Sequence, residues 1–554
     1  MSLFNVAISG LNAARIGLQT TNHNIANAST PGYSRQQIFQ TTHTPMFTGA
    51  GFIGQGTSVE TVRRLYSEQL NAQVLAAGTG AAEMGSYLAQ IRQIDNLLAD
   101  PSAGLSPALS GFFKAVQEAA AHPASLPARQ SMLSASQALV ARFQAIDQRM
   151  TEIRQGVNAM IASEVAAINA HAQQIAGINQ RIVLAQAAGP GQPANDLLDQ
   201  RDQLIADLNA KIRTTTLLQS DGTYSVFIGN GQPLVIGTTP FALQAVQSPT
   251  DPERIVVAMQ APGGGSILMP ESLLTGGALG GLLGFRSQSL DAAQDDLGLI
   301  ALTLAQDFNA QHRLGQDLDG DLGGDFFDVG LIGTTQRAGD LALALANTRD
   351  IALAAPIRTS ALLANTGTGS VSAGTVDAPP PPHVNLQQPV TITFTSATTF
   401  DVTGTGTGNP TGVAYTAGGN IGYNGWTIQI GGAPAAGDVF TVGPNLNGVA
   451  DNRNGVLLGA LQTQETMAGG TATYQSYYST IVARIGNKTR EVEIAGQAQQ
   501  SLHDQAQATR DRMSGVNLDE EAANLLRYQQ AYQAAAKVIG IAGTLFEEIL
   551  ALGR

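Results

Sequence analysis

A proline-free stretch from Ala128 to Gly189 constrains the fold of this chain more than any other feature of its sequence. Large apolar residues recur through it at almost heptad spacing, the pattern of a long helix that packs one face against a partner. They are Leu139, Phe143, Ile146, Met150, Ile153, Val157, Ile161, Val165, Ile168, Ala172, Ile175 and Ile182. One helix over residues 139–182 would be roughly 65 Å long at about 1.5 Å per residue. The sequence therefore predicts a rod rather than a globule.

A second stripe of apolar residues at helical spacing runs from Tyr474 to Met513, and the two long helices are natural partners. Ser514-Gly515 is expected to end this helix, and Asn517 with Glu520 is a plausible N-terminal cap for a last one. The last helix keeps an a/d pattern almost to the end of the chain. Its stripe is Leu525, Tyr528, Tyr532, Ala535, Ile539, Ala542, Phe546 and Ile549.

The beginning of the chain also predicts a helix with one apolar stripe, which Ser2 caps and Thr30-Pro31-Gly32 ends. The stripe is Leu3, Ala7, Leu11, Ala14, Leu18 and Ile25. Arg15 and Arg35 are the only formal charges from Met1 to Val59, too few for an ordinary solvated helix. We therefore expect the stripes of the first and last helices to form an assembly interface between copies of the chain, with the two helices paired.

Between the helical parts the sequence changes to short alternating segments with glycine turns, which indicates β structure. The first such segment covers residues 213–274, and a helix is expected over roughly residues 281–312. A proline run at Pro379–Pro382 then introduces Thr-rich and Val-rich segments in which Asp401 and Asp438 are the only charges up to Ala450. This pattern predicts an inserted β domain over residues 376–451.

The expected fold is mainly α with inserted β domains, in an elongated multi-domain rod. The terminal helices pair as coiled-coil-like arms, so the termini lie together and the β domains lie at the far end. The predicted division is a terminal helical assembly domain, a helical rod domain, a β-rich segment and an inserted β domain. The terminal helical assembly domain is predicted over residues 1–63 and 511–554, and the helical rod domain over residues 64–212, 275–375 and 452–510. The β-rich segment covers residues 213–274, and the inserted β domain covers residues 376–451.

Composition narrows the classes of function. The chain has 554 residues, enough for about three or four domains. A net charge of −13 argues against nucleic acid as a partner, because a phosphate binder needs a basic surface. There is no cysteine, so disulfides and thiolate chemistry are absent. No apolar run reaches the roughly 18 residues of a membrane span, and no cleavable secretory signal is evident. The protein is expected to stay inside the cell or to leave by another route.

Two motifs imitate binding sites. The glycines Gly49, Gly51 and Gly54 in "GAGFIG" have the spacing of a dinucleotide-binding turn, but that turn must follow a buried strand and open a helix. The segment "DLDGDLGGDFFD", Asp317 to Asp328, begins like a calcium-binding loop, yet its sixth position is Leu322 and its twelfth is an aspartate. A loop with structural glycines and an acidic turn are the favoured interpretations.

Other catalytic signals are missing. The seven histidines form no i, i+4 pair, and neither a nucleophile elbow nor a phosphate loop occurs. The sequence therefore predicts no enzyme, no catalytic residue, no cofactor and no metal site.

The two ends of the chain carry a family resemblance. "SGLNAARIGLQTTNHNIANASTPGYSRQ" resembles the N-terminal signature of the bacterial flagellar rod, hook and hook-associated proteins, and "SGVNLDEEAANLLRYQQAYQAAAKVI" resembles their C-terminal signature. The "TPGYSRQ" form, the length, "GGLLGFR", "DLDGDLGGDFF" and "YNGWTIQIGGAPAAGD" are similar to the members that join hook and filament. The likeness is strong over roughly the first 65 and last 45 residues and weaker in the β segments.

This resemblance implies a structural subunit of the axial tube, a homo-oligomer in a ring or helical tube at the hook–filament junction. Its implied partners are the hook protein, the next hook-associated protein and an export chaperone at the C-terminal region, without nucleic acid or membrane. Export through the flagellar type III apparatus is implied as the route of secretion. A hook or distal rod subunit is the alternative within the family, and a nucleotide-dependent oxidoreductase using the three glycines of "GAGFIG" is the remote one.

Overall fold

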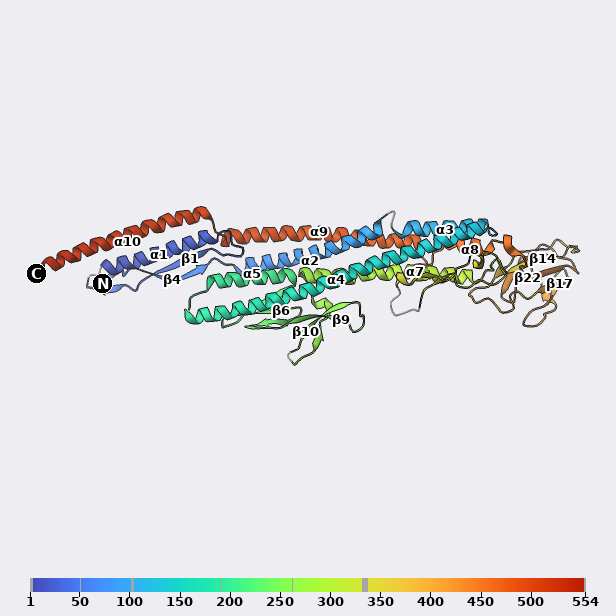
Figure 1. The fold of residues 1–554 in the computed structure, drawn as a ribbon, viewed down its shortest axis with the longest axis horizontal. Helices are drawn as coiled ribbons and strands as arrows, with labels where there is room; N and C mark the ends of the chain where they lie inside the picture. Colours follow the sequence, from blue (N-terminus) through green and yellow to red (C-terminus); the bar gives the residue numbers. More distant parts are fainter. Residues whose placement is uncertain are drawn as a thin grey trace. The chain divides into compact units, whose positions relative to one another are not determined.

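The computed structural model describes residues 3–49, 51–100, 104–189, 191–261, 263–330 and 337–552. In this part of the chain the fold is mainly α with inserted β sheets, as the sequence predicted (Figure 1). The chain forms two compact units. Three of the four boundaries between them fall inside the long helices α2 (Glu68–Ala99), α4 (Leu126–Ala188) and α9 (Tyr474–Ser514), and the fourth follows Arg286. Unit 1 is Met1–Gln90, Gln155–Arg286 and Thr489–Arg554; unit 2 is Ile91–Arg154 and Ser287–Lys488. The ranges predicted for the rod domain instead keep α2, α4 and most of α9 together.

Helix α4 is the long helix that the proline-free stretch predicts. All twelve residues of its predicted stripe, from Leu139 to Ile182, are buried. Helix α9 ends at Ser514, at the predicted Ser-Gly break. In unit 1 it runs antiparallel to α2, where Gly78 lies against His503 and Met84 against Gly496. The apolar stripes in the sequence had paired α9 with α4 and gave no sign of this contact with α2.

Unit 1 contains both ends of the chain. Helix α1 (Leu3–Asn27) is followed by strands β1 (Gln36–Thr42) and β4 (Thr57–Arg64), which pair as an antiparallel ribbon. A small hairpin of β2 (Met46–Thr48) and β3 (Gly51–Ile53) connects the two strands of the ribbon. The last helix, α10 (Leu518–Leu552), packs against α1. The "GAGFIG" segment thus belongs to a hairpin followed by a strand, so its glycines open no helix.

The rest of unit 1 holds helix α5 (Asn195–Lys211), two antiparallel sheets and helix α6 (Gly277–Phe285). The first sheet has the order β5-β6-β7-β8 and the second the order β11-β10-β9. Their strands are β5 (Thr214–Leu218), β6 (Tyr224–Ile228), β7 (Gln232–Ile236), β8 (Thr239–Pro240), β9 (Leu243–Gln247), β10 (Ile255–Gln260) and β11 (Ser266–Leu268). In unit 1, Asn169 and Asn179 of α4 donate hydrogen bonds to backbone carbonyls of these sheets.

Unit 2 has a helical part with an aromatic core. Helices α3 (Leu105–Ala121), α7 (Asp291–His312) and α8 (Arg453–Ala460) meet there, and strands β12 (Phe327–Asp328) and β13 (Ala342–Leu343) form a short pair. Phe112, Phe308, Phe326 and Phe327 are buried, with ring centroids 4.8–6.5 Å apart. A π-helical turn, Arg286–Leu290, joins α6 to α7, so the helical run begins at Gly277, slightly before the predicted start near residue 281.

Unit 2 also has a β domain whose boundary differs from the prediction. One sheet has the order β14-β22-β17-β18-β19, and β21 pairs with β15, β16 and β20. The strands are β14 (Ile357–Ala361), β15 (Ser370–Val371), β16 (Thr375–Val376), β17 (Val390–Ser396), β18 (Thr399–Thr403), β19 (Val413–Ala414), β20 (Asn420–Tyr423), β21 (Trp426–Gly431) and β22 (Val439–Pro444). Because β14 and β15 belong to these sheets, a start at residue 376 is too late.

The β domain has its own core around Trp426, the single tryptophan of the chain, which is fully buried. Its two ends meet, since the backbone N–H of Asn445 donates to the carbonyl oxygen of Pro356 at 3.1 Å. A domain with one core and adjacent ends is able to fold as an insertion in a helical chain.

Candidate assembly interface

The terminal helices α1 and α10 pack antiparallel in unit 1, so both ends of the chain lie at one end of the pair (Figure 1). The contact repeats every seven residues: Asn24 bonds Glu521, Gly17 lies under the ring of Tyr528, and Gly10 lies near Ala535. A Cβ at Gly17 would be 2.6 Å from that ring, whereas one at Gly10 would be 4.0 Å from the Ala535 methyl group. Glycine at position 17 therefore allows the close approach of α10.

Most residues of the two predicted stripes are buried or half-buried within one chain. On α1, Ala7 and Ala14 are buried and Leu11 and Leu18 are half-buried. On α10 the half-buried stripe residues are Leu525, Tyr528, Ala535, Ile539 and Ala542. Within one chain the two helices thus cover part of both stripes, and the expectation that the stripes also pack between copies stays a prediction.

The remaining residues of the two predicted stripes are exposed, or their side chains lie outside the described residues. Ile25 and Tyr532 are each 38% exposed, and Phe546 is 63% exposed near the end of α10. The side chains of Leu3 and Ile549 lie outside the described residues, as does Ser2.

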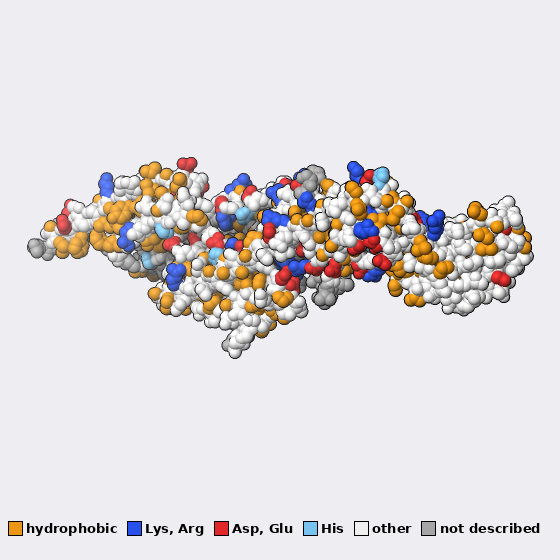
Figure 2. Space-filling model, turned by 45° about the vertical axis from the view of Figure 1, so that its right-hand side comes forward, with side chains coloured by type: hydrophobic (Ala, Val, Ile, Leu, Met, Phe, Trp, Pro, Cys, Tyr) orange, Lys and Arg blue, Asp and Glu red, His pale blue; other side chains and the backbone are white. Residues whose placement is uncertain are grey.

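Sequence reasoning missed a second set of apolar residues on these helices. Val538, Ile541 and Leu545, here called the outer stripe, are 38–52% exposed and lie on a different face of α10 from the contact with α1. Figure 2 shows hydrophobic side chains (orange) gathered over the part of unit 1 that carries α10. The spacing of the outer stripe, three and then four residues, is itself a helical signal that the sequence analysis passed over in favour of the stronger a/d pattern.

More exposed apolar residues lie nearby on α1 and on the β2–β3 hairpin. On α1 they are Phe4, Val6 and Ile8, and on the hairpin they are Met46, Phe47, Phe52 and Ile53. The sequence gives few signs of the hairpin, because strands of three residues are too short to show a clear alternation.

A buried polar cluster fixes the base of the helix pair. Asn24 is 1% exposed, and its side-chain oxygen accepts from the backbone N–H of Gln36 at 2.9 Å and from the Tyr33 hydroxyl at 2.7 Å. Its amide group donates to the Gln36 carbonyl oxygen at 2.9 Å and to the Glu521 carboxylate at 3.1 Å. One side chain thus joins α1, β1 and α10, and its donors and acceptor are all paired, as burial requires.

Arg35 also belongs to this polar cluster. Its guanidinium pairs with Glu521, which is 1% exposed, and with Glu520 in the first turn of α10. The backbone N–H of Arg35 donates to the carbonyl oxygen of Ser514, the last residue of α9. Asn517 caps α10 as predicted, accepting from Asp519 at 3.0 Å. Glu520 makes no reciprocal cap bond and instead pairs with Arg35, a partner that only the tertiary structure supplies.

A second ion cluster ties this base to α5. The Arg64 guanidinium pairs with Asp199 and Asp202, each at 2.7 Å, and the backbone N–H of Ser34 donates to Asp199. Burial raises the pKa of Asp202, and burial together with nearby carboxylates raises that of Tyr33. Burial alone would lower the pKa of Arg64, but its two aspartate partners raise it on balance. The residues of the "TPGYSRQ" signature therefore act as a structural joint.

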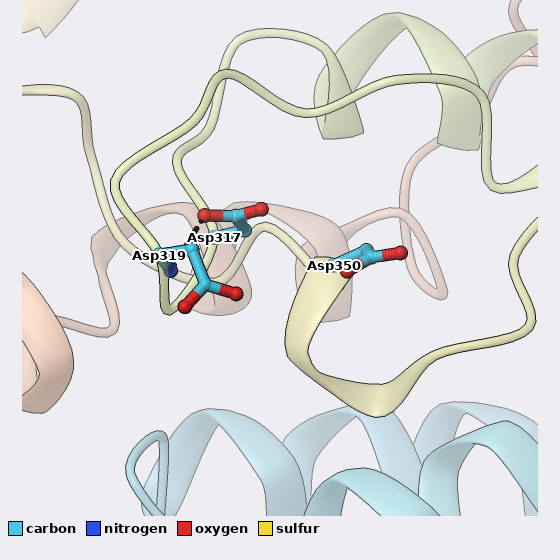
Figure 3. Close-up of side chains that lie close together, drawn as sticks. All are labelled: Asp317, Asp319 and Asp350. Atoms are coloured by element: carbon cyan, nitrogen blue, oxygen red, sulfur yellow. Dashed lines mark hydrogen bonds between the residues drawn. The ribbon is translucent and has the colours of Figure 1, made fainter.

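The acidic turn holds a cluster of carboxylates without the features of a calcium site. Asp317, Asp319 and Asp350 lie close together in unit 2 (Figure 3). Asp317 accepts from the backbone N–H groups of Asp319 and Asp321, and Arg349 pairs with Asp319. Arg349 thus neutralises part of the negative charge of the cluster, as the interpretation of this segment as an acidic turn requires.

His312 is fully buried, bonding the Gly324 carbonyl oxygen through Nδ1 and accepting from the Ala352 N–H through Nε2. Both ring nitrogens are used within the core, as in a structural histidine. In the described part of the chain, no helix has the length and apolar character that crossing a membrane requires.

Comparison with known proteins agrees with this architecture. A family model for the flagellar hook-associated protein FlgK helical domain matches residues 91–327. Models for the flagella basal body rod protein and the C-terminal region of flagellar basal body rod FlgEFG proteins match residues 4–33 and 508–552. The flagellar hook-associated protein 1 of Escherichia coli (strain K12) is 34% identical over 99% of both chains. The chain belongs to the flagellar hook-associated protein 1 family.

Members of this family are structural proteins of the bacterial flagellum at the junction between hook and filament, and this chain is one of them. A more distant relative in Bacillus subtilis (strain 168) is 23% identical over 98% of this chain and 96% of its own. The solved structure of the flagellar hook junction protein FlgK from Burkholderia pseudomallei superposes with a TM-score of 0.72 at 29% identity. It covers 81% of this chain and all of that one. The full-length matches are to hook-associated protein 1, whereas the two rod-protein models match the terminal residues 4–33 and 508–552.

Proposed function

We propose that the chain joins hook to filament by assembling through its terminal helices into the wall of the axial tube. The exposed apolar residues of α1 and α10 carry this proposal, since large exposed apolar surfaces mark sites of protein association. The surfaces are nearly free of charge: no acidic or basic residue occurs at positions 3–14, and Lys537 is the only one at positions 528–546. Packing such surfaces between copies requires little desolvation of ions.

The buried cluster around Asn24 gives this surface a defined geometry. It fixes the angle between α1, β1 and α10 through hydrogen bonds and ion pairs, so that every copy presents the same face. In a repeated assembly a fixed angle is needed, because the same contact must form at each position.

The proposal includes the partners that the family resemblance implies. The hook protein lies below and the next hook-associated protein above, and an export chaperone binds the C-terminal region before assembly. Export through the flagellar type III apparatus without cleavage takes the chain to this position. No nucleic acid or membrane takes part.

The test uses a motile strain without its own junction protein, which is complemented with this chain. Electron microscopy should show hooks without filaments in the deletion strain and attached filaments after complementation. Ile541→Asp/Leu545→Asp should abolish attachment, because both changes put carboxylates on the outer stripe without touching the α1–α10 contact. Gln530→Asp, also exposed on α10, is the control and should still complement.

Two results would contradict the proposal: bare hooks after complementation with the unmodified chain, or normal filaments with the double aspartate variant. Changes at Leu525, Ile539 or Leu11 are less informative, because these residues also hold α1 and α10 together within one chain.

A further inference from the structure

The β2–β3 hairpin is an exposed aromatic projection of unit 1. Phe47 and Phe52 are 68% and 73% exposed, and their rings meet edge to face with centroids 5.3 Å apart. Met46 and Ile53 beside them are also exposed, and no acidic or basic residue occurs from Gln36 to Val59. A pair of rings that stays in water on one chain is the type of group that anchors a protein interface.

The hairpin has a defined place next to the beginning of α1. The β1–β4 ribbon starts beside Asn24, where Gln36 is bonded, and runs back along α1. At its other end the backbone N–H of Thr57 donates to the Ser9 hydroxyl, and Gly56 lies tightly against Ser9 and Val6. The hairpin is therefore held near the first turns of α1, with its base fixed by the ribbon.

A cleft of about 640 Å³ lies at the opposite end of α1, in the same unit. Its lining comes from α1, the turn after it, α4 and α5. Pro31, Tyr33, Gly177, Ile178 and Leu204 give it apolar surface, and polar side chains beside them include His23, Arg181 and Asp196. Gly177 is exposed, and a Cβ there would meet no atom within 4 Å, so the α4 side of the cleft is open. A cleft of this volume is of the size that holds a drug-sized group, which two aromatic rings match.

We propose that the Phe47–Phe52 hairpin of one copy occupies this cleft on a second copy. The inference rests on the proposed function, in which copies of the chain lie side by side. The hairpin and the cleft lie at opposite ends of α1. Ser9 is beside the base of the hairpin and Asn27 is in the lining of the cleft, and the helix between them is roughly 25 Å long at about 1.5 Å per residue. The hairpin of one chain therefore cannot fill the cleft of the same chain.

The partner is a second copy for two reasons. Each copy carries both the hairpin and this cleft, so in a repeated structure the hairpin of one copy can fill the cleft of the next. The hairpin also lacks the basic residues that would attract an anionic lipid surface. A contact between two different surfaces of the same chain is heterologous and produces a ring or an open helical assembly, not a closed dimer.

The absence of natural cysteine allows a direct test in assembled flagella. Ile53→Cys/Gly177→Cys keeps both phenylalanines and puts one thiol on the hairpin and one in the cleft. A short bismaleimide added to isolated flagella should link neighbouring copies into a ladder of covalent multimers. Ile53→Cys/Gly156→Cys is the matched control, since Gly156 is also an exposed glycine of α4 with no atom within 4 Å of its Cβ position. The control should give no ladder.

The outcomes separate this inference from the proposed function. The hairpin contact is wrong if flagella that contain Ile53→Cys/Gly177→Cys give no ladder, or if the Ile53→Cys/Gly156→Cys control gives the same ladder. Either result leaves the proposed function intact. A hairpin thiol linked to a different protein would overturn it as well. If the Gly177 variant alone fails to enter flagella, the cleft is needed for assembly, which supports the inference.

A second variant removes the projection instead. Phe47→Ser/Phe52→Ser should leave the far-ultraviolet circular dichroism and the tryptophan fluorescence of the full chain unchanged, because the rings pack on each other at the surface. It should lower the number of attached filaments at least tenfold. Normal filaments from this variant would refute the contact, whereas bare hooks from the unmodified chain would refute the proposed function.

Discussion

Replacing Asn24 by alanine should detach the terminal helices from the rest of unit 1. The change removes four hydrogen bonds, two to the backbone of Gln36, one from the Tyr33 hydroxyl and one to Glu521. At about 1 kcal/mol for each bond, the local loss is about 4 kcal/mol. Asn24 is 1% exposed, so water cannot readily replace these partners.

Hydrogen exchange read by mass spectrometry measures this loss segment by segment. A cost of about 4 kcal/mol raises the population of the open form by about a thousandfold, since 1.4 kcal/mol is a factor of ten. Peptides from α1 and α10 should exchange faster by up to that factor. The fluorescence of the single tryptophan, which lies in the other unit, should stay unchanged.

Asn22→Ala is the matched control, because Asn22 lies on the same helix and is exposed. Asn24→Asp makes a sharper comparison: it keeps the acceptor for Tyr33 but puts a second carboxylate beside Glu521, where two like charges oppose each other. It should be more damaging than alanine at pH 7 and recover in part at lower pH. The reasoning fails if Asn24→Ala exchanges within tenfold of the unmodified chain, or if Asn22→Ala matches it.

Other predictions test the packing and the domain boundaries. Gly17→Ala should weaken the helix pair by about 1–3 kcal/mol, because its Cβ would lie 2.6 Å from the ring of Tyr528, whereas Gly10→Ala should be tolerated; limited proteolysis of α10 distinguishes them. Burial lowers the pKa of His312 from 6.5 to about 4, so the unfolded chain binds its proton first as the pH falls. Stability should therefore drop by about 3 kcal/mol between pH 6.5 and 4 in urea titrations, and less in a His312→Gln variant. Deleting residues 357–444 with a short Gly/Ser bridge should leave a soluble, helical chain by circular dichroism, whereas deletion from residue 376 should aggregate, because β14 loses its partner β22.

The long helices were predictable from the sequence because their signal is local. The stripe of α4 repeats over many turns without proline, and each of its residues is buried as the spacing requires. The pairing of the terminal helices was predictable for the same reason, since each stripe needs an apolar partner. What the pattern could not show is how much of each stripe the other helix covers, because coverage depends on the small residues Gly10 and Gly17 opposite it.

The polar joint was not predictable from local pattern. Asn22, Asn24 and Asn27 look alike in the sequence, yet Asn24 alone of the three is buried, and its partner Glu521 is almost 500 positions away. The start of the β domain was missed in the same way. The proline run is a strong local signal, but β14 belongs to the domain because it pairs with β22 at the domain's far end.

The two kinds of contact in the terminal region have different physical roles. Apolar burial is non-directional, so the exposed surfaces of α1, α10 and the hairpin would associate in several registers if nothing fixed them. Buried hydrogen bonds and ion pairs add little net stability, but they are costly to leave unpaired, so the cluster of Asn24, Arg35 and Glu521 permits one arrangement. A subunit that repeats around a wall needs both. The same argument explains why charge is concentrated at the joint and sparse on the surfaces. A charge on a repeating contact would need a partner at every position, whereas a charge inside one chain carries its partner with it.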